Sequence, residues 1–140
     1  MTQVWKNDAV VPVTVLRASL NDASRPLFEA LQEGDVVRVS GTSKGKGFQG
    51  VVKRHGFHGG PKTHGQKNRL RAPGSIGPTA PQRVLKGRKM GGHMGVARIT
   101  VRNLKIVEIR HDTQELLLRG AVPGNRGGMI EVKSSKFESS

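Results

Sequence analysis

The feature that most constrains the fold of this chain is a long segment without any acidic residue. All ten Asp and Glu lie outside residues 36–107, and that window holds 16 of the 24 Lys and Arg. The remainder carries 8 basic and 10 acidic residues, a net charge of −2. Like charges concentrated in this way favour a polyanionic partner. The ordinary explanation for a run of charged residues is a solvent-exposed surface. Such surfaces normally carry both positive and negative residues, whereas this window carries only positive ones.

The middle of the chain, residues 41–95, differs in composition from its flanks. It holds 14 of the 19 glycines and four of the five histidines. Neither a period of 2 nor a period of 3.6 persists in it. So long a segment without regular structure is uncommon inside a compact domain. We therefore predict an extended, basic, Gly/Lys/Arg-rich arm at 41–95 that becomes ordered on a partner.

The flanks, residues 1–40 and 96–134, predict a mainly β body, a small antiparallel β-barrel or sheet with the arm inserted between its strands. Pro12 suggests that the second strand lies at an edge. Ser24 is a candidate N-cap for a helix over residues 24–32, with Gly34 after its end. Asn103 is expected to separate two strands, and residues 135–140 to form a flexible tail. The expected strands are residues 1–6, 10–17, 35–40, 97–101, 104–109, 115–119 and 129–133.

Several classes of protein are disfavoured by what the sequence lacks. There is no cysteine, which excludes disulfides and thiolate metal sites. No apolar run approaches the roughly 20 residues of a membrane helix. The first 16 residues show no secretory signal. We expect neither a membrane partner nor a membrane-active role, since the glycines and prolines of the arm disfavour a basic amphipathic helix.

Gly45, Gly47 and Gly50 spell G-x-G-x-x-G, the pattern of a nucleotide-binding loop. A dinucleotide fold needs a helix directly after these glycines. The following VVKRHGFHGGP contains three glycines and a proline, so we expect no such helix. A kinase loop needs later catalytic and metal-binding acids, and no acid lies between Asp35 and Glu108. The motif therefore does not predict a nucleotide enzyme.

The histidines of the arm do not predict a metal site. His55 and His58 have weak ligand spacing, and no carboxylate in the arm would complete a site around them. The arm also lacks an acid that could orient a Ser–His pair. We expect no catalytic residue, no metal, no cofactor and no small-molecule substrate.

The arm has the composition of an RNA ligand instead. Its cations would neutralise phosphates, and its glycines would let the backbone approach them closely. Arginines can also stack on splayed bases. The expected RNA-binding residues are Lys44, Lys46, Lys53, Arg54, Lys62, His64, Lys67, Arg69, Arg71, Arg83, Lys86, Arg88 and Lys89.

Five segments, in order along the chain, resemble the bacterial-type large-ribosomal-subunit protein L three family. The N-terminal MTQVWKNDAVVPVTVL also resembles the opening hairpin of that family. Together they cover most of the chain, and their order is specific. The five segments are GTSKGKGFQGVVKRHGFHGGPKTHG, RAPGSIG, VLKGRKMGGHMG, RITVRNLKIVEI and LLLRGAVPG.

The resemblance implies a structural constituent of the large ribosomal subunit, not an enzyme, on cytoplasmic or organellar ribosomes. It implies a translation-protein-like β-barrel and an arm that runs through large-subunit rRNA toward the peptidyl transferase centre. It also implies early assembly and neighbouring proteins such as large-subunit proteins fourteen and nineteen. A stand-alone assembly factor of the same family is the alternative. By position the arm tip would comprise Ser75, Ile76, Gly77, Pro78, Thr79, Ala80, Pro81 and Gln82.

The chain departs from the pattern of the family in three places. It is shorter than usual members, and it begins at a point inside their sequence. A short linker between Ala18 and Leu27 replaces a long stretch of barrel, so a trimmed barrel is expected. The tip GPTAPQR is one residue shorter than the family's, and we do not predict methylation of Gln82.

Overall fold

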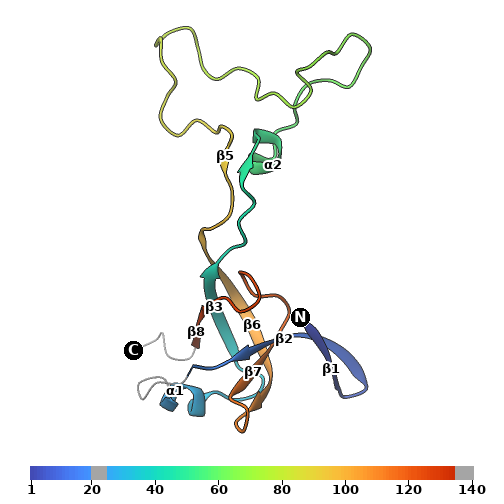
Figure 1. Ribbon diagram of the computed structural model, residues 1–140, viewed down its shortest axis with the longest axis vertical. Helices are drawn as coiled ribbons and strands as arrows, with labels where there is room; N and C mark the ends of the chain where they lie inside the picture. The colour runs from blue at the N-terminus through green and yellow to red at the C-terminus, as the bar shows by residue number, and fades with distance from the viewer. Residues whose placement is uncertain (20–24, 135–140) are drawn as a thin grey trace. The chain divides into compact units, whose positions relative to one another are not determined.

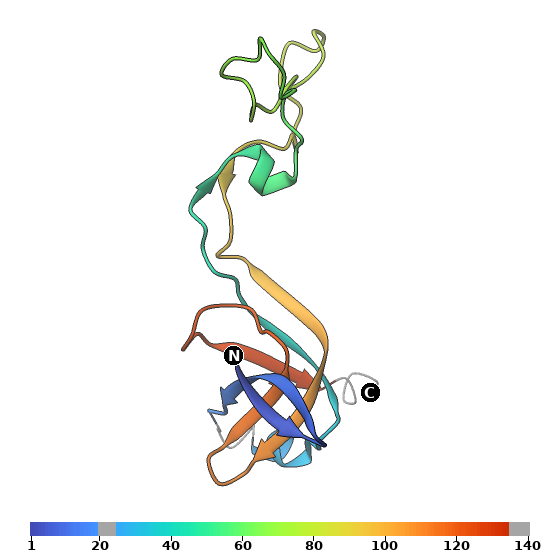
Figure 2. The ribbon, with the colours of Figure 1, turned by 90° about the vertical axis from the view of Figure 1, so that its right-hand side faces the viewer.

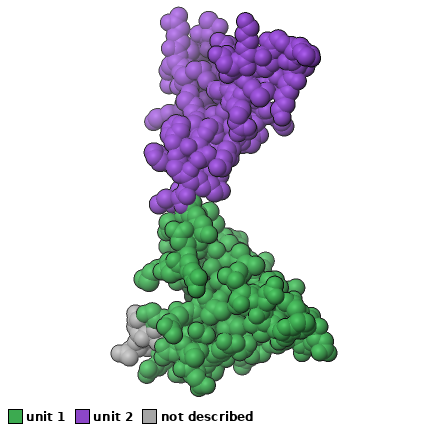
Figure 3. Space-filling model, turned by 45° about the vertical axis from the view of Figure 1, so that its right-hand side comes forward, with its two compact units in different colours: residues 1–44, 98–140 green, residues 45–97 purple. Residues whose placement is uncertain are grey.

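The computed structural model describes residues 1–19 and 25–134, and it is mainly β, as the sequence predicts (Figure 1). Two compact units can be distinguished: Met1–Lys44 with Arg98–Ser140, and Gly45–Ala97 (Figure 3). The second unit is inserted in sequence between two paired strands of the first. No helix in the described part of the chain is long and apolar enough to cross a membrane.

The first unit is a six-stranded sheet in which every neighbouring pair is antiparallel. Its order is β1-β2-β7-β6-β3-β8. In the described residues β1 and β8 each pair on one side only, so the hydrogen-bonded sheet is open and not a closed barrel. The strands are β1 (Thr2–Lys6), β2 (Ala9–Arg17), β3 (Val36–Thr42), β6 (Arg98–Arg110), β7 (Glu115–Arg119) and β8 (Ile130–Ser134).

The sheet curves around one main core. Alternation along β3 buries Val37 and Val39 completely, as expected for a strand with one apolar face. Side chains from β2, β3, β6, β7 and β8 join this cluster. Phe28 and Leu31, on or just after the short helix α1 (Arg25–Ala30), also belong to it. Every strand of the sheet except β1 therefore contributes to this core. Its buried members are Phe28, Leu31, Val37, Val39, Ile106, Leu116 and Leu118.

A second, smaller core lies under the N-terminal hairpin. Val13, Val107 and Leu117 are buried together, with Val4 and Val11 packed against them. Leu117 and Leu118 are neighbours on β7 that are both fully buried. Since successive side chains of a strand point to opposite faces, β7 is covered on both faces.

The expectation that Pro12 places its strand at an edge is wrong. β2 lies between β1 and β7. The carbonyl of Pro12 accepts a hydrogen bond from the Gly120 N–H at 3.0 Å, just beyond the end of β7. The N–H and C=O of one strand residue point the same way. The missing donor of Pro12 therefore faces Gly120, one residue past the last paired residue of β7, so the proline lies at the end of this ladder and not inside it.

The expected break at Asn103 is also wrong, because β6 runs unbroken through it. Val37 pairs with Leu104 and Val39 with Val101, so two residues of β6 oppose one of β3. This is a β-bulge, and Asn103 adopts a φ of +60° in it. Asn tolerates that left-handed conformation better than most residues. Asn103, which looked like a break between two strands, is therefore the site of a bulge within one strand.

The helix is shorter than predicted. α1 ends at Ala30, whereas the sequence indicated Gln32, and the candidate cap Ser24 lies outside the described residues. The chain then turns to pair with β6: Gly34 N–H donates to Ile106 O at 2.9 Å, and Ile106 N–H donates to Asp35 O at 2.9 Å. Gly34 adopts a φ of +88°, which suits the glycine predicted there.

Candidate nucleic-acid interface

The second unit, Gly45–Ala97, has almost no apolar core. Val51 is its only buried hydrophobic residue among those described, at 5% exposure. Its regular structure comprises β4 (Phe48–Gln49), α2 (Val51–His55) and β5 (Gly92–His93) (Figure 2). Backbone hydrogen bonds and close glycine contacts therefore shape this unit more than packing does.

A short antiparallel ladder joins the two ends of this unit. Lys46 N–H donates to Met94 O at 2.9 Å, and Met94 N–H donates to Gly47 O at 3.0 Å. Phe48 then pairs with His93, and their rings meet edge to face with centroids 6.1 Å apart. Residues more than 40 positions apart in sequence are thereby paired. No periodicity in the sequence indicated this contact.

A short helix follows the G-x-G-x-x-G glycines. α2 begins after Gly50 and is five residues long. It ends at Gly56, which adopts a left-handed φ of +71° and donates its N–H to Val52 O at 3.0 Å. Gly56 limits this helix to about one turn.

Two side chains of α2 attach it to the returning chain. Arg54 Nη1 donates to the Met90 carbonyl at 2.9 Å, and His55 Nε2 lies 3.0 Å from the same oxygen. A Cβ at Gly92 would lie 2.6 Å from Arg54 Nη1, so glycine leaves room for the guanidinium. Arg54, expected to bind phosphate, is thus engaged within the protein.

Farther along, residues 59–71 close on themselves. Gly60 N–H donates to Leu70 O at 2.8 Å. A Cβ at Gly59 would lie 2.2 Å from that same oxygen, and Gly59 has a φ of +79°, so only glycine fits there. The loop carries Lys62, His64, Lys67 and Arg69 as exposed side chains, with Arg71 just beyond the crossing.

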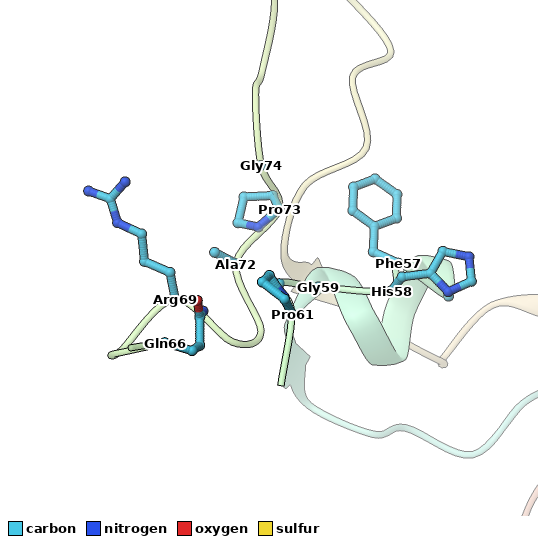
Figure 4. A pocket seen from close by; sticks show the side chains of 11 residues that line it. Phe57, His58, Gly59, Pro61, Gln66, Arg69, Ala72, Pro73 and Gly74 are labelled. Atoms are coloured by element: carbon cyan, nitrogen blue, oxygen red, sulfur yellow. The ribbon is translucent and has the colours of Figure 1, made fainter. Parts of the chain in front are cut away.

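An open hollow of about 500 Å³ lies beside this crossing, between residues 56 and 74 (Figure 4). Phe57, Pro61 and Pro73 supply much of its apolar lining, and Arg69 is the charged residue among those that line it. No acid contributes to the lining. The hollow therefore offers one candidate acid–base group, His58, without a lining carboxylate to orient it.

The predicted tip residues are all exposed. Ser75 Oγ donates to Gly77 O at 3.1 Å, and Arg88 Nη2 donates to the Ser75 carbonyl. Arg88, like Arg54, therefore has a partner inside the protein. The tip is otherwise held by few contacts.

The predicted RNA-binding side chains are exposed to solvent. Among the described residues none of the arm's Lys or Arg forms an ion pair, since the ion pairs found there involve residues outside the arm. Exposed cations without acidic partners are suited to release counterions when they meet phosphates. The exposed set is Lys44, Lys46, Lys53, Arg54, Lys62, His64, Lys67, Arg69, Arg71, Arg83, Lys86, Arg88 and Lys89.

The histidines of the arm do not gather around a common point. Within residues 1–19 and 25–134 no group of three His, Cys, Asp or Glu side chains could hold a metal ion. His55 lies against Phe57, with ring centroids 6.1 Å apart, and His93 lies against Phe48. These two rings therefore contribute to the structure of the unit.

Comparison with known proteins identifies the family. The family model described as Ribosomal protein L3 matches residues 12–116. The large ribosomal subunit protein uL3 of Chlorobium phaeovibrioides (strain DSM 265 / 1930) is 50% identical over 118 residues, which cover 84% of this chain and 56% of that relative. Its counterpart in Chloroherpeton thalassium (strain ATCC 35110 / GB-78) is 48% identical over 118 residues, covering 84% and 57%.

This chain therefore spans a little over half the length of these curated relatives. The residues matched by the family model include the whole arm with its glycines, together with β3, β6 and most of β2. The resemblance seen in the motifs is confirmed, and the chain belongs to the Ribosomal protein L3 family.

Proposed function

We propose that this chain is a structural constituent of the large ribosomal subunit, and that residues 41–95 form its rRNA-binding arm. The observation that carries the proposal is a unit with one buried hydrophobic residue among those described and a set of exposed cations without acids. Such a surface gains little from packing on itself and much from a polyanion. The names of the relatives place them in the large ribosomal subunit.

In this proposal the protein resides on ribosomes in the cytoplasm and supports early assembly without catalysis. Residues 75–82 form the arm tip, and they lie toward the peptidyl transferase centre. The body is a trimmed barrel beside other large-subunit proteins, such as proteins fourteen and nineteen. The curved sheet, in which β2, β3, β6, β7 and β8 share one core, supports a barrel-like body.

An arm variant tests the role of the cations. Arg69, Arg71, Lys86 and Lys89 are exposed and have no side-chain partner among the described residues, so Ala at all four positions removes charge with little effect on folding. Arg54 and Arg88 are kept, because replacing them would also remove hydrogen bonds inside the unit. Affinity for large-subunit rRNA should fall by orders of magnitude at moderate salt. The dependence of affinity on salt should become shallower by about 0.7–0.9 for each phosphate that is no longer neutralised.

Sedimentation tests the place of the protein in the subunit. After a high-salt wash, one copy per mature large subunit is expected. Confinement to precursor particles would identify an assembly factor instead. Recovery only in the fractions without particles, together with unchanged rRNA affinity of the arm variant, would overturn the proposal.

A further inference from the structure

A second basic surface lies on the body, outside the arm. On β3 the residues at even positions from 36 to 42 face away from the main core, and on β8 residues 131 and 133 do so. The sheet therefore has an apolar face toward the core and an opposite face that is rich in cations. We call this opposite face the outer basic face; its cations are Arg38, Arg98, Arg102, Lys105 and Lys133.

The β-bulge in β6 produces the density of charge on this face. Val101 and Leu104 pair with the core residues Val39 and Val37, so the side chains of Val101 and Leu104 lie on the core-facing side of the sheet. The two residues between them, Arg102 and Asn103, oppose Arg38 and are both exposed. The extra residue of the bulge changes the alternation of β6, so that Arg102 and Lys105, three positions apart, lie on the same face.

The pairing register arranges these cations over three neighbouring strands. Arg38 pairs with Lys133 on one side and faces the bulge that contains Arg102 on the other. Strands lie about 4.8 Å apart, so this row is about 10 Å wide. Arg98 and Lys105 lie seven residues apart on β6, a separation of about 23 Å along the strand. Several successive phosphates of one nucleic-acid strand can reach an area of this size.

Among the described residues of this face the one acid is Glu131, and it is already paired. Lys133 Nζ lies 2.9 Å from Glu131 Oε1, and Arg98 contacts the other oxygen. Arg102 and Lys105 are exposed and form no ion pair in the described part of the chain. The net charge of the face is therefore positive, and two of its cations are available to an external anion.

The side chains of this face favour contacts with RNA phosphates over contacts with bases. The described aromatic residues lie on β1, α1 and β4 and just after α2, so none belongs to β3, β6 or β8. The face therefore lacks the aromatic platform on which proteins commonly stack the bases of single strands. Two of its hydroxyls are hydrogen-bonded to each other, with Ser40 Oγ 2.8 Å from Thr100 Oγ1. Cations on a sheet without such a platform fit backbone phosphates, which carry no sequence information.

We propose that the outer basic face binds the phosphate backbone of double-stranded RNA. The inference rests on the proposed function, because it adds a second contact of this chain with RNA beside that of the arm. It assigns to Arg102 and Lys105 a role that does not depend on any arm residue.

The test compares variants that remove the same charge from two faces. R102Q/K105Q removes two cations from the outer basic face. R17Q/R119Q removes two exposed cations from β2 and β7, which are not part of that face. The full chain is titrated into two fluorescent RNA duplexes of unrelated sequence, and anisotropy is recorded over a series of salt concentrations. The charge-keeping R102K/K105R variant controls for local packing.

We expect R102Q/K105Q to bind both duplexes on the order of tenfold more weakly, with a salt slope smaller in magnitude by about 2. R17Q/R119Q and R102K/K105R should bind much as the unmodified chain does. Equal weakening by R102Q/K105Q and R17Q/R119Q, or weakening on only one of the duplexes, would overturn the inference. So would weaker binding to anionic phospholipid vesicles with unchanged binding to RNA.

The arm variant distinguishes this inference from the proposed function. If the arm variant binds RNA more weakly and R102Q/K105Q does not, the arm proposal stands and the outer basic face does not bind RNA. If the unmodified chain binds neither duplex nor large-subunit rRNA, both proposals fail.

Discussion

At the scale of single residues, Gly59 shows how a glycine can determine a loop. Its φ of +79° and the 2.2 Å approach of a Cβ to Leu70 O leave no room for a side chain. We predict that Gly59→Ala opens the crossing between Gly60 and Leu70, because a backbone atom cannot move aside as a flexible side chain can. With large-subunit rRNA bound, the Gly60 amide should exchange faster in this variant than in the unmodified chain, while the thermal unfolding of the body stays unchanged.

Gly65 offers a matched control in the same loop. It has a φ of +87°, but nothing lies within 4 Å of the place where its Cβ would be. Gly65→Ala therefore introduces the strain of an alanine at positive φ, about 1–2 kcal/mol, but no steric clash of its Cβ. If both variants released the Gly60 amide equally, backbone strain rather than the close contact would explain the glycine at position 59.

Glu131 is a residue whose ionisation is linked to stability. The hydrogen bond from Lys133 is the largest cause that lowers the pKa of Glu131 from 4.5, and Arg98 lowers this pKa further. A carboxyl with a lowered pKa stabilises the fold above its unfolded pKa, and that contribution disappears as the pH falls through the lowered value. Glu131→Gln should therefore flatten the decrease of stability below about pH 4.5.

The pH dependence of the urea midpoint measures this effect. Glu29→Gln is the control, because Glu29 is exposed on α1 and forms no ion pair within the described residues. If both substitutions flattened the acid limb to the same extent, the cations beside Glu131 would not be the cause.

At the scale of elements, the bulge of β6 determines which of its side chains lie toward the core and which lie on the outer basic face. It keeps Val101 and Leu104 toward the core while Arg102 faces outward. Asn103 makes this possible with a φ of +60°. We predict that Asn103→Val destabilises the body by about 1–2 kcal/mol, because β-branched residues are strained at positive φ. Asn103→Gly should be close to neutral, since glycine adopts this conformation without that strain.

Urea unfolding of the two variants measures the difference. Equal stability of Asn103→Val and Asn103→Gly would show that the strand accommodates the valine by moving out of the bulge. The residue pairs Val37–Leu104 and Val39–Val101 would then have to shift, which the amide chemical shifts of β3 would reveal.

At the scale of the whole molecule, apolar burial and positive charge are divided between the two units. Among the described residues, ten of the eleven buried hydrophobic side chains belong to the body, and Val51 alone belongs to the unit at Gly45–Ala97. Local stability follows buried contacts. We predict that without RNA the amides of β3, β6 and β7 exchange slowly and those of the inserted unit exchange fast. Large-subunit rRNA should slow exchange across residues 45–97 and change the body core little.

Hydrogen exchange followed by mass spectrometry measures both states of the full chain. The arm variant is the control, since it should keep fast exchange even when rRNA is present. Slow exchange throughout the inserted unit in the absence of RNA would contradict the prediction. It would mean that the ladder around Lys46 and Met94 is sufficient to hold the unit in one conformation.

Much of the fold follows from local signals in the sequence. Alternation predicts β3 within two residues of its observed bounds, because the side chains of the strand alternate between its two faces. The strand expected at residues 115–119 is β7, although both of its faces are covered. The acid-free window predicts which residues carry exposed cations, because charged side chains seldom enter a core without partners. The ordered glycine motifs also sufficed to indicate the family. These properties depend on residue type and on nearest neighbours along the chain.

Only the tertiary structure decided how distant segments use those residues. Pro12 predicted an edge strand and Asn103 a break, yet β7 ends where Pro12 lacks its donor, and a bulge admits Asn103 into β6. The pairing of residues 46–49 with residues 92–94 has no periodic signal either. Sequence determined the local conformations and the charge of each segment. Strand order, register and the pairing of distant segments depend on contacts across the fold, which no local pattern specifies.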